Sequence, residues 1–338
     1  MRRSQNSRLF GGFRAPPPLL IFFLVLASVL SATFACRRST PVIALIPRTT
    51  GVSLWESERS GAESVASRLH FRLYWNAPTR EDDIEGQIAL VERVRRGGYA
   101  GLVLAPDQAL ALMTPVQQVL SAGIPTVIVS SPLPLAPGNH LFYVVNDNEE
   151  AGRIAAKRIA AILHGKGSVA LLSIDPDISG IMTRLAVFES YLAHYYPDIH
   201  TVGKRMGAYN GAEAQQITAE LLQAHPELDA LFSFTAVSTR GAYFALKSMG
   251  RIRDVKLVGC EQEGDLLDLV SQGEIDSLLL EDTYQMGRKA LELIAAHQQG
   301  KRVPASISLR PLLVTRENIN SPEIVRALDR GWSGVPDE

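Results

Sequence analysis

Two clusters of carboxylates are the residues of this chain whose spacing could support acid–base chemistry. Asp175 and Asp177 are separated by one proline, and residues 81–83 are Glu-Asp-Asp. Two nearby carboxyl groups can divide the roles of general acid and general base when their surroundings separate their pKa values. Both clusters fall where a loop or the start of a helix is expected, and capping and solvation explain acidic residues there. We therefore interpret neither cluster as catalytic.

The motifs typical of enzymes and cofactor sites are missing from the sequence. No strand is followed by GxGxxG, and neither HExxH nor GxSxG occurs. GKGS at 165–168 lacks the upstream glycine of a phosphate-binding loop, so it fits a turn that ends a helix. The seven histidines are scattered without the spacing of metal ligands. These patterns predict a protein that is not an enzyme and that holds no metal or cofactor.

The N-terminal residues have the layout of a secretory signal. Residues 1–14 include four arginines and no acidic residue, and the run 19–30 is apolar apart from Ser28. This run is shorter than the roughly twenty residues that span a bilayer. A basic start, a short apolar segment and the residues that follow predict a signal peptide over 1–36. If the apolar run extends through Phe34, an uncleaved membrane anchor is the alternative.

Cys36 follows the apolar run, and the residues around it are consistent with two kinds of signal-peptide cleavage. Residues 33–35, Thr-Phe-Ala, fit a loose small-x-small site for signal peptidase. Ala35-Cys36 also resembles the end of a bacterial lipobox, in which the cysteine is lipidated and becomes the first residue. Thr33 and Phe34 depart from the usual lipobox residues at their positions. Either interpretation places the protein in the periplasm or cell envelope, and the second attaches it to the membrane through Cys36.

The composition is that of an ordinary globular protein. The hydrophobic content is 46% and the formal net charge is −1. Removal of the signal leaves about 300 residues, which corresponds to two compact domains. The near-neutral charge argues against a nucleic-acid partner, which requires clustered lysine and arginine. Cys260 lies at the end of an apolar run, where we expect a small buried residue without a disulfide partner.

Short apolar runs alternate with helical patterns along most of the chain. Continuous apolar runs of this length are typical of strands that are buried on both faces of a parallel sheet. Their alternation with helices predicts an α/β fold with two doubly wound parallel sheets. The strands are expected at 41–47, 71–75, 101–106, 124–131, 141–145, 168–174, about 200–205, 230–234, 255–261, 276–282 and 306–314, with a polar tail over 321–338.

Several segments carry a resemblance to a known family. They are IALIPRTT with SGAESVA, GLVLAP, AGIPTVIV, NDNEEAGRIAA, HPELDALFSF, KLVGCEQ and SQGEIDSLLLEDTYQMGRKAL. With them, residues 41–320 resemble the periplasmic sugar-binding proteins of bacterial ABC transporters, the ribose-binding type, which is related to the sensing core of LacI-type repressors. A signal precedes this region in place of a DNA-binding helix-turn-helix, which favours the exported protein over a repressor.

The resemblance implies the periplasmic binding protein type I fold, with two lobes joined by a three-strand hinge. It implies a first lobe over 41–145 plus 281–312 and a second over 146–280 plus 313–320. A sugar or similar ligand would bind in the cleft between the lobes, which close around it. The expected protein is a monomer without a cofactor that delivers its ligand to an inner-membrane ABC permease. A periplasmic sensor for a membrane receptor kinase is the alternative, and an α/β enzyme is a weaker one.

In the first lobe, the resemblance points to four ligand-binding residues. Trp55 matches an aromatic residue that stacks on the sugar, and Asn76 matches an asparagine that hydrogen-bonds the ligand. Ser130 and Ser131 stand where sugar binders usually have an Asp-Arg pair. Alternatively, Trp55 packs within its own lobe and Asn76 is a turn residue.

In the second lobe and the hinge, the resemblance points to four more residues. Arg184 lies near the usual ligand arginine, and Thr235 replaces an asparagine. Glu261 and Glu281 stand in place of a hinge aspartate and a hinge glutamine. With Trp55, these two glutamates would suit a ligand that carries an amine, or a polyol. The alternative is that the glutamates form ion pairs with nearby arginine or lysine residues.

Overall fold

The structure is a computed structural model that describes residues 40–333 except 51, 81 and 208–209. The chain divides into two units, Met1–Thr40 and Pro41–Glu338, and the description below concerns the second. The expected signal peptide and Cys36 lie outside the described residues. Within the described part, no helix is both long enough and apolar enough to cross a membrane.

Sheet A contains six strands, all paired in parallel, in the order β11-β5-β4-β3-β1-β2. Its strands are β1 (Val42–Ile46), β2 (Arg72–Trp75), β3 (Gly101–Leu104), β4 (Thr126–Ser130), β5 (Leu141–Asn146) and β11 (Ser306–Leu309). Four helices cover it, namely α2 (Ser53–Ala66), α3 (Ile84–Arg96), α4 (Ala109–Ser121) and α10 (Thr283–Gln298). We call sheet A and these helices the first lobe.

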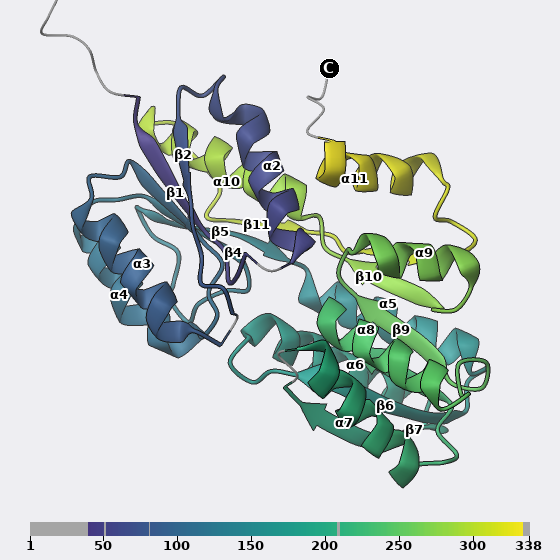
Figure 1. Ribbon diagram of the computed structural model, residues 1–338. Helices are drawn as coiled ribbons and strands as arrows, with labels where there is room; N and C mark the ends of the chain where they lie inside the picture. The colour runs from purple at the N-terminus through teal and green to yellow at the C-terminus, as the bar shows by residue number, and fades with distance from the viewer. Residues whose placement is uncertain (1–39, 51, 81, 208–209, 334–338) are drawn as a thin grey trace, which may run out of the picture. The chain divides into compact units, whose positions relative to one another are not determined.

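The apolar residues of β1 explain why helices lie on both faces of sheet A. Successive strand residues point to opposite faces. Ile43 and Leu45 pack with α2 and α10, whereas Ala44 and Ile46 pack with α3 and α4. Figure 1 shows these two helix pairs on either side of the sheet. A strand that is buried on both faces needs no polar alternation, as the sequence predicts.

Sheet B also contains six strands, in the order β12-β10-β9-β8-β6-β7. Its strands are β6 (Gly167–Ile174), β7 (Ile199–Met206), β8 (Ala230–Ser233), β9 (Lys256–Cys260), β10 (Ser277–Leu280) and β12 (Leu312–Thr315). The described helices around it are α5 (Asn148–Ile162), α6 (Ser179–Tyr195), α7 (Gly211–Ala224), α8 (Ala236–Ser248) and α9 (Gly264–Gln272). We call this part the second lobe. Its pairings are parallel except that β12 runs antiparallel to β10.

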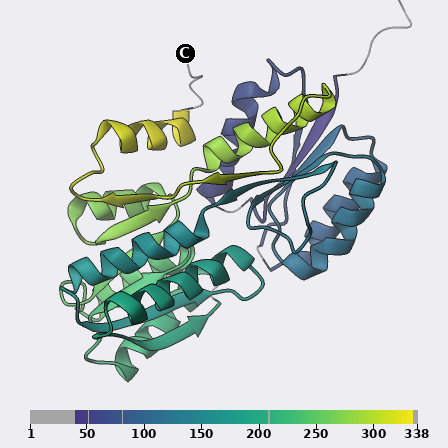
Figure 2. The ribbon, with the colours of Figure 1, turned by 180° about the vertical axis from the view of Figure 1, so that it is seen from behind.

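The chain passes between the two sheets three times, which confirms the expected three-strand hinge. The crossings run from β5 to α5, from β10 to α10 and from β11 to β12, and they are visible from the reverse side in Figure 2. The first and third crossings contact each other, since the Asp147 N–H donates to the Leu309 carbonyl at 2.9 Å. One strand is expected at 306–314, but the chain forms two short strands there, β11 in sheet A and β12 in sheet B.

Helices α2 and α10 cross closely because each has a glycine at the contact. A Cβ atom on Gly61 would lie 1.9 Å from the Tyr284 carbonyl oxygen, and one on Gly287 would lie 1.9 Å from that of Glu58. No side chain fits at such distances. This crossing fixes the start of α2, which lies at the carboxyl edge of sheet A.

Where a polar tail is expected, the residues after Ser321 form helix α11 (Pro322–Ser333). Pro322 takes the first helical position, where a missing N–H costs nothing. Ile324 is 4% exposed and Leu328 is partly buried, and both pack on the core of the second lobe. The helix also contacts α2 of the first lobe.

Candidate functional site

The carboxyl edges of the two sheets face each other, and direct hydrogen bonds join them. The Ser179 hydroxyl of the second lobe donates to the Pro132 carbonyl of the first at 2.8 Å. The Ala109 N–H at the start of α4 donates to the Asp177 carbonyl at 3.3 Å. Both bonds involve loops that follow the carboxyl ends of strands, where ligands bind in open α/β sheets. We call this region the lobe junction.

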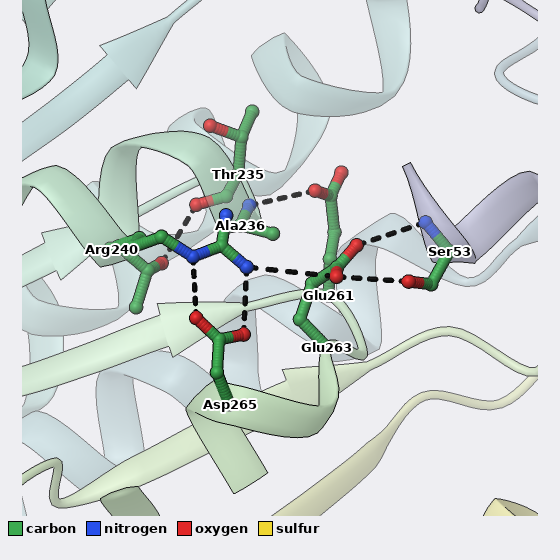
Figure 3. A network of polar contacts seen from close by, with 8 residues as sticks. Ser53, Thr235, Ala236, Arg240, Glu261, Glu263 and Asp265 are labelled. Atoms are coloured by element: carbon green, nitrogen blue, oxygen red, sulfur yellow. Dashed lines mark hydrogen bonds and ion pairs between the residues drawn. The ribbon is translucent and has the colours of Figure 1, made fainter. Parts of the chain in front are cut away.

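A third contact across the junction involves the start of α2. The Glu263 carboxylate accepts hydrogen bonds from the Ser53 N–H at 3.0 Å and from the Ser53 hydroxyl at 2.9 Å (Figure 3). A helix N-terminus favours a negative charge because its N–H groups are unpaired. In the second lobe, Arg240 lies 3.6 Å from Glu263 and forms a two-pronged ion pair with Asp265. Arg240 therefore holds the loop that carries Glu263.

Thr235 and Glu261 lie together at the start of α8 (Figure 3). The Thr235 hydroxyl caps the helix by accepting the Ser238 N–H, and it donates to the Ser173 hydroxyl at 3.2 Å. Glu261 has a φ angle of 71°, an uncommon value for a non-glycine residue. Its carboxylate accepts the Ala236 N–H at 2.7 Å. The structure thus gives this glutamate a helix N-terminus as a partner.

Arg184 and Glu281 form a buried ion pair in the hinge. Their Nη2 and Oε1 atoms are 2.6 Å apart, and their side chains are 4% and 8% exposed. Arg184 also donates to Asn148 Oδ1 from Nη2 at 2.8 Å and from Nε at 3.2 Å. Asn148 follows the first crossing and Glu281 precedes the second, so Arg184 connects two of the three hinge segments. The alternative that a glutamate pairs with a nearby arginine is confirmed for Glu281.

The charges around Arg184 are set by burial and by its partners. Burial opposes the charged guanidinium, but the Glu281 carboxylate beside it outweighs this effect, and the pKa of Arg184 is raised. Burial raises the pKa of Cys260 to about 12, so its thiol is protonated at neutral pH. Arg184 Nη1 lies 3.3 Å from this neutral sulfur. Cys260 is buried as expected, and it acts as a weak acceptor beside the ion pair.

Trp55 is fully buried at the start of α2 and packs in the core of the first lobe. The Arg48 guanidinium lies over its ring, 4.9 Å from the centroid. Its indole Nε1 has no hydrogen-bond partner among the described residues. One turn later, burial raises the pKa of Glu58 to about 8, although Arg48 opposes the shift. Trp55 thus packs within its lobe, and its role in stacking on a ligand stays a prediction.

The other predicted residues of the first lobe lie at the ends of β2 and β4. Asn76 is half-buried and donates to the Tyr74 hydroxyl at 2.9 Å. Ser130 has a φ angle of 64°, which turns the chain sharply, and it is buried with Ser131. A Cβ atom on Gly180 of α6 would lie 2.6 Å from the Ser131 hydroxyl oxygen. Ser131 therefore touches the second lobe, whereas ligand contact by these residues stays a prediction.

Sequence reasoning missed four polar residues at the junction: Arg48, Gln87, Asp107 and Glu263. Gln87 is fully buried, and its amide joins two loops of the first lobe. Its Nε2 donates to the carbonyls of Pro47 at 3.2 Å and Ala105 at 2.8 Å, and its Oε1 accepts the Asp107 N–H at 2.9 Å. A signal existed, because Gln87 falls on the same face of its helix as the apolar Val91 and Val94.

Within the described ranges, no group of three or more histidine, cysteine, aspartate or glutamate side chains could hold a metal ion. The polar residues of the junction are instead hydroxyls, amides and pairs of opposite charges. Such groups can bind an uncharged polar molecule by hydrogen bonds.

Comparisons with known proteins agree with this arrangement. The model of the periplasmic binding protein domain family matches residues 43–302. The ribose import binding protein of Bacillus subtilis (strain 168) is 26% identical over 238 residues, which cover 70% of this chain and 75% of the relative. The D-allose-binding periplasmic protein of Escherichia coli (strain K12) is 23% identical over 269 residues, or 77% and 86% of the two chains.

The fold is also found in solved structures. A carbohydrate transporter solute binding protein from Agrobacterium radiobacter, in complex with D-arabinose, superposes with a TM-score of 0.81. It is 23% identical, and the match covers 86% of this chain and 99% of that one. At this identity the likeness concerns the fold.

Proposed function

Because the chain belongs to the periplasmic binding protein family, we propose that it binds a sugar between its lobes and delivers it to an ABC permease. The relatives in the comparisons include ribose- and allose-binding proteins, and the structural neighbours include proteins with bound D-arabinose and D-allose. The protein binds its ligand rather than transforming it. Its compartment is the periplasm or cell envelope.

The observation that carries this proposal is the lobe junction itself. Buried polar side chains from both sheets gather at the carboxyl edges, and three pairs of residues bond across from one lobe to the other. Burial of polar groups is costly unless they serve as hydrogen-bond partners. A sugar bound at this place would meet hydroxyl, amide and charged groups from both lobes at once. Closure of the lobes would then exclude water from the ligand.

The charges at the junction favour an uncharged sugar over an amine-bearing ligand. Glu281 is compensated by Arg184 at 2.6 Å, and Glu261 accepts the Ala236 N–H at the start of α8. A ligand ammonium would therefore meet carboxylates that already have partners. A neutral sugar needs no such compensation, because its hydroxyls both donate and accept hydrogen bonds.

Thermal unfolding of the chain from Thr40 onwards, with a panel of sugars, polyols and amino sugars, tests this proposal. A ligand that binds only the folded state at 100 times its Kd adds about 2.7 kcal/mol of stability. This corresponds to a rise in Tm of roughly 5–10 °C. We expect the rise with a neutral pentose or hexose. A rise with amino sugars alone would reject the neutral ligand, and no rise with any member would contradict sugar binding.

We also propose that Cys36 is lipidated and holds the protein at the membrane beside its permease. The support is the position of Cys36 directly after the apolar run and Ala35. Mass spectrometry of the N-terminal peptide from the full chain, expressed in a bacterium, tests this proposal. A diacylated Cys36 supports it, and an unmodified N-terminus at or near residue 36 contradicts it. The Cys36→Ser variant should appear in the soluble fraction of the envelope.

A further inference from the structure

The order of strands locates the point in each sheet where a ligand should bind. In sheet A, β2 lies on one side of β1 and the next strand in the chain, β3, lies on the other side of β1. Sheet B repeats this pattern with β6, between β7 and β8. Loops at such a reversal diverge to opposite faces of the sheet and leave a crevice at its carboxyl edge. The switch points of this protein therefore lie between β1 and β3 and between β6 and β8.

Two oppositely charged residues flank the switch point of sheet A. Arg48 lies two residues after β1, and Asp107 lies three residues after β3. Each is 5% exposed and makes contacts within the protein, as buried charged side chains require. The next turn begins with Ala109, which bonds to Asp177 of the second lobe. Asp107 therefore lies where the two lobes meet.

Gln87 fixes the two loops relative to each other. Its amide uses both ends, with bonds to the carbonyls of Pro47 and Ala105 and to the N–H of Asp107, at 2.8–3.2 Å. The buried Gln87 side chain thus bonds both to Pro47, the residue before Arg48, and to the backbone of Asp107. Side chains on loops that are held in this way are positioned before a ligand arrives.

Trp55 contacts the same site through Arg48. The Arg48 guanidinium lies 4.9 Å from the centre of the Trp55 ring, within the range of a cation–π contact. A guanidinium carries its N–H groups in its own plane, so one that lies over an aromatic ring can still donate to oxygen atoms. Trp55 then acts as a positioning residue for Arg48.

We propose that Arg48 and Asp107 bind two neighbouring hydroxyl groups of the ligand, which makes them the charged clamp of the first lobe. This inference rests on the proposed sugar-binding function. Asp107 accepts from the hydroxyls and Arg48 donates to their oxygens, and such charge-assisted bonds are stronger than neutral ones. The switch point of sheet B offers the Ser173 and Thr235 hydroxyls, 3.2 Å apart. Because the clamp carries one charge of each sign, it favours an uncharged polyol over an anion or a cation.

The test is the affinity of Arg48→Met and Asp107→Asn for the neutral sugar that raises the Tm of the wild type, measured by calorimetry. We expect each variant to bind about 10- to 100-fold more weakly, because a lost hydrogen bond to a charged group has roughly this effect. Gln87→Glu, which cannot donate to the two carbonyls, should weaken binding by a smaller factor. Asp254→Asn, on an exposed side chain far from the junction, serves as the matched control.

Monodeoxy analogues of the same sugar separate contact from a structural role. The wild type should bind the analogue that lacks the hydroxyl bound by Asp107 more weakly than the parent sugar. On that analogue, Asp107→Asn should bind no more weakly than the wild type. If Asp107→Asn loses the same factor on every analogue, or if both clamp variants bind like the wild type, the clamp is refuted while sugar binding stands. If the wild type binds no sugar in the panel, the proposed function fails and the clamp fails with it. If Arg48→Met or Asp107→Asn does not fold, the affinities of the wild type and of Gln87→Glu for the same analogues decide whether the clamp exists.

Discussion

Removal of the Arg184 guanidinium is expected to destabilise the protein by about 3–5 kcal/mol, the cost of breaking a buried ion pair. Arg184→Met leaves the Glu281 carboxylate, 8% exposed, without the donor that lies at 2.6 Å. It also removes both donors to Asn148 Oδ1. With roughly 2–4 °C per kcal/mol for a chain of this size, the Tm should fall by about 6–20 °C.

Urea unfolding at pH 7 without ligand, followed by circular dichroism, measures this effect. The matched control is Lys204→Met, whose ammonium lies 2.6 Å from Glu189 in an ion pair with side chains 47% and 31% exposed. An exposed pair contributes less than about 1 kcal/mol, so this variant should unfold like the wild type. The double variant Arg184→Met with Glu281→Leu should recover most of the loss, because no unpaired buried charge remains.

Two results would refute this reasoning. If Arg184→Met lost no more stability than Lys204→Met, the pair would behave as a solvated surface contact. If the double variant were as unstable as the single one, the loss would come from packing of the long side chain and not from an uncompensated charge.

Three further predictions concern the junction, the core of the first lobe and the C-terminal helix. Glu263→Gln should weaken sugar binding several-fold, because the Glu263 carboxylate accepts two hydrogen bonds from Ser53 across the lobe junction and a neutral amide accepts them less strongly; an unchanged Kd in calorimetry would contradict this. Burial raises the pKa of Glu58 from its ordinary value of 4.5 to about 8, so the folded state binds more protons between these values and stability should fall as pH rises from about 4.5 to 8. Urea unfolding at pH 5 and pH 8 measures this slope, and Glu58→Gln should abolish it. Ile324→Ala should cost about 2 kcal/mol in unfolding free energy, because Ile324 of α11 is buried in the core of the second lobe; a loss below about 0.5 kcal/mol would show that this contact is weak.

Most of the fold could be predicted from the sequence because its signals are local. Strands such as β3 and β4 are short, continuous apolar runs, and all their residues are buried. Helices α3, α5 and α7 are each preceded by an aspartate or asparagine that accepts an N–H of the first turn. Both features act within a few residues of chain. The antiparallel direction of β12 was not visible, since it depends on where the third crossing places the strand.

The candidate site was less predictable because its contacts join distant residues. Ser53 and Glu263 are 210 residues apart, and Arg184 and Glu281 are 97 apart. A single sequence shows that Glu281 ends an apolar run, but not which cation approaches it. The sequence therefore left open whether the two glutamates were available to a ligand. For Glu281 the structure gives the answer in the Arg184 ion pair.

The polar groups of the junction are held by their own lobes, and this bears on affinity. Gln87 fixes the loops before Arg48 and Asp107, Arg184 joins two hinge segments, and Arg240 holds the loop of Glu263. Ordering an immobilised side chain on binding costs about 0.5–1.5 kcal/mol, so groups that are ordered in advance leave more of the interaction energy for affinity. Rigid loops also limit the arrangements of hydroxyls that can be satisfied together. Selectivity among sugars should therefore depend on these supporting residues as much as on the groups that touch the ligand.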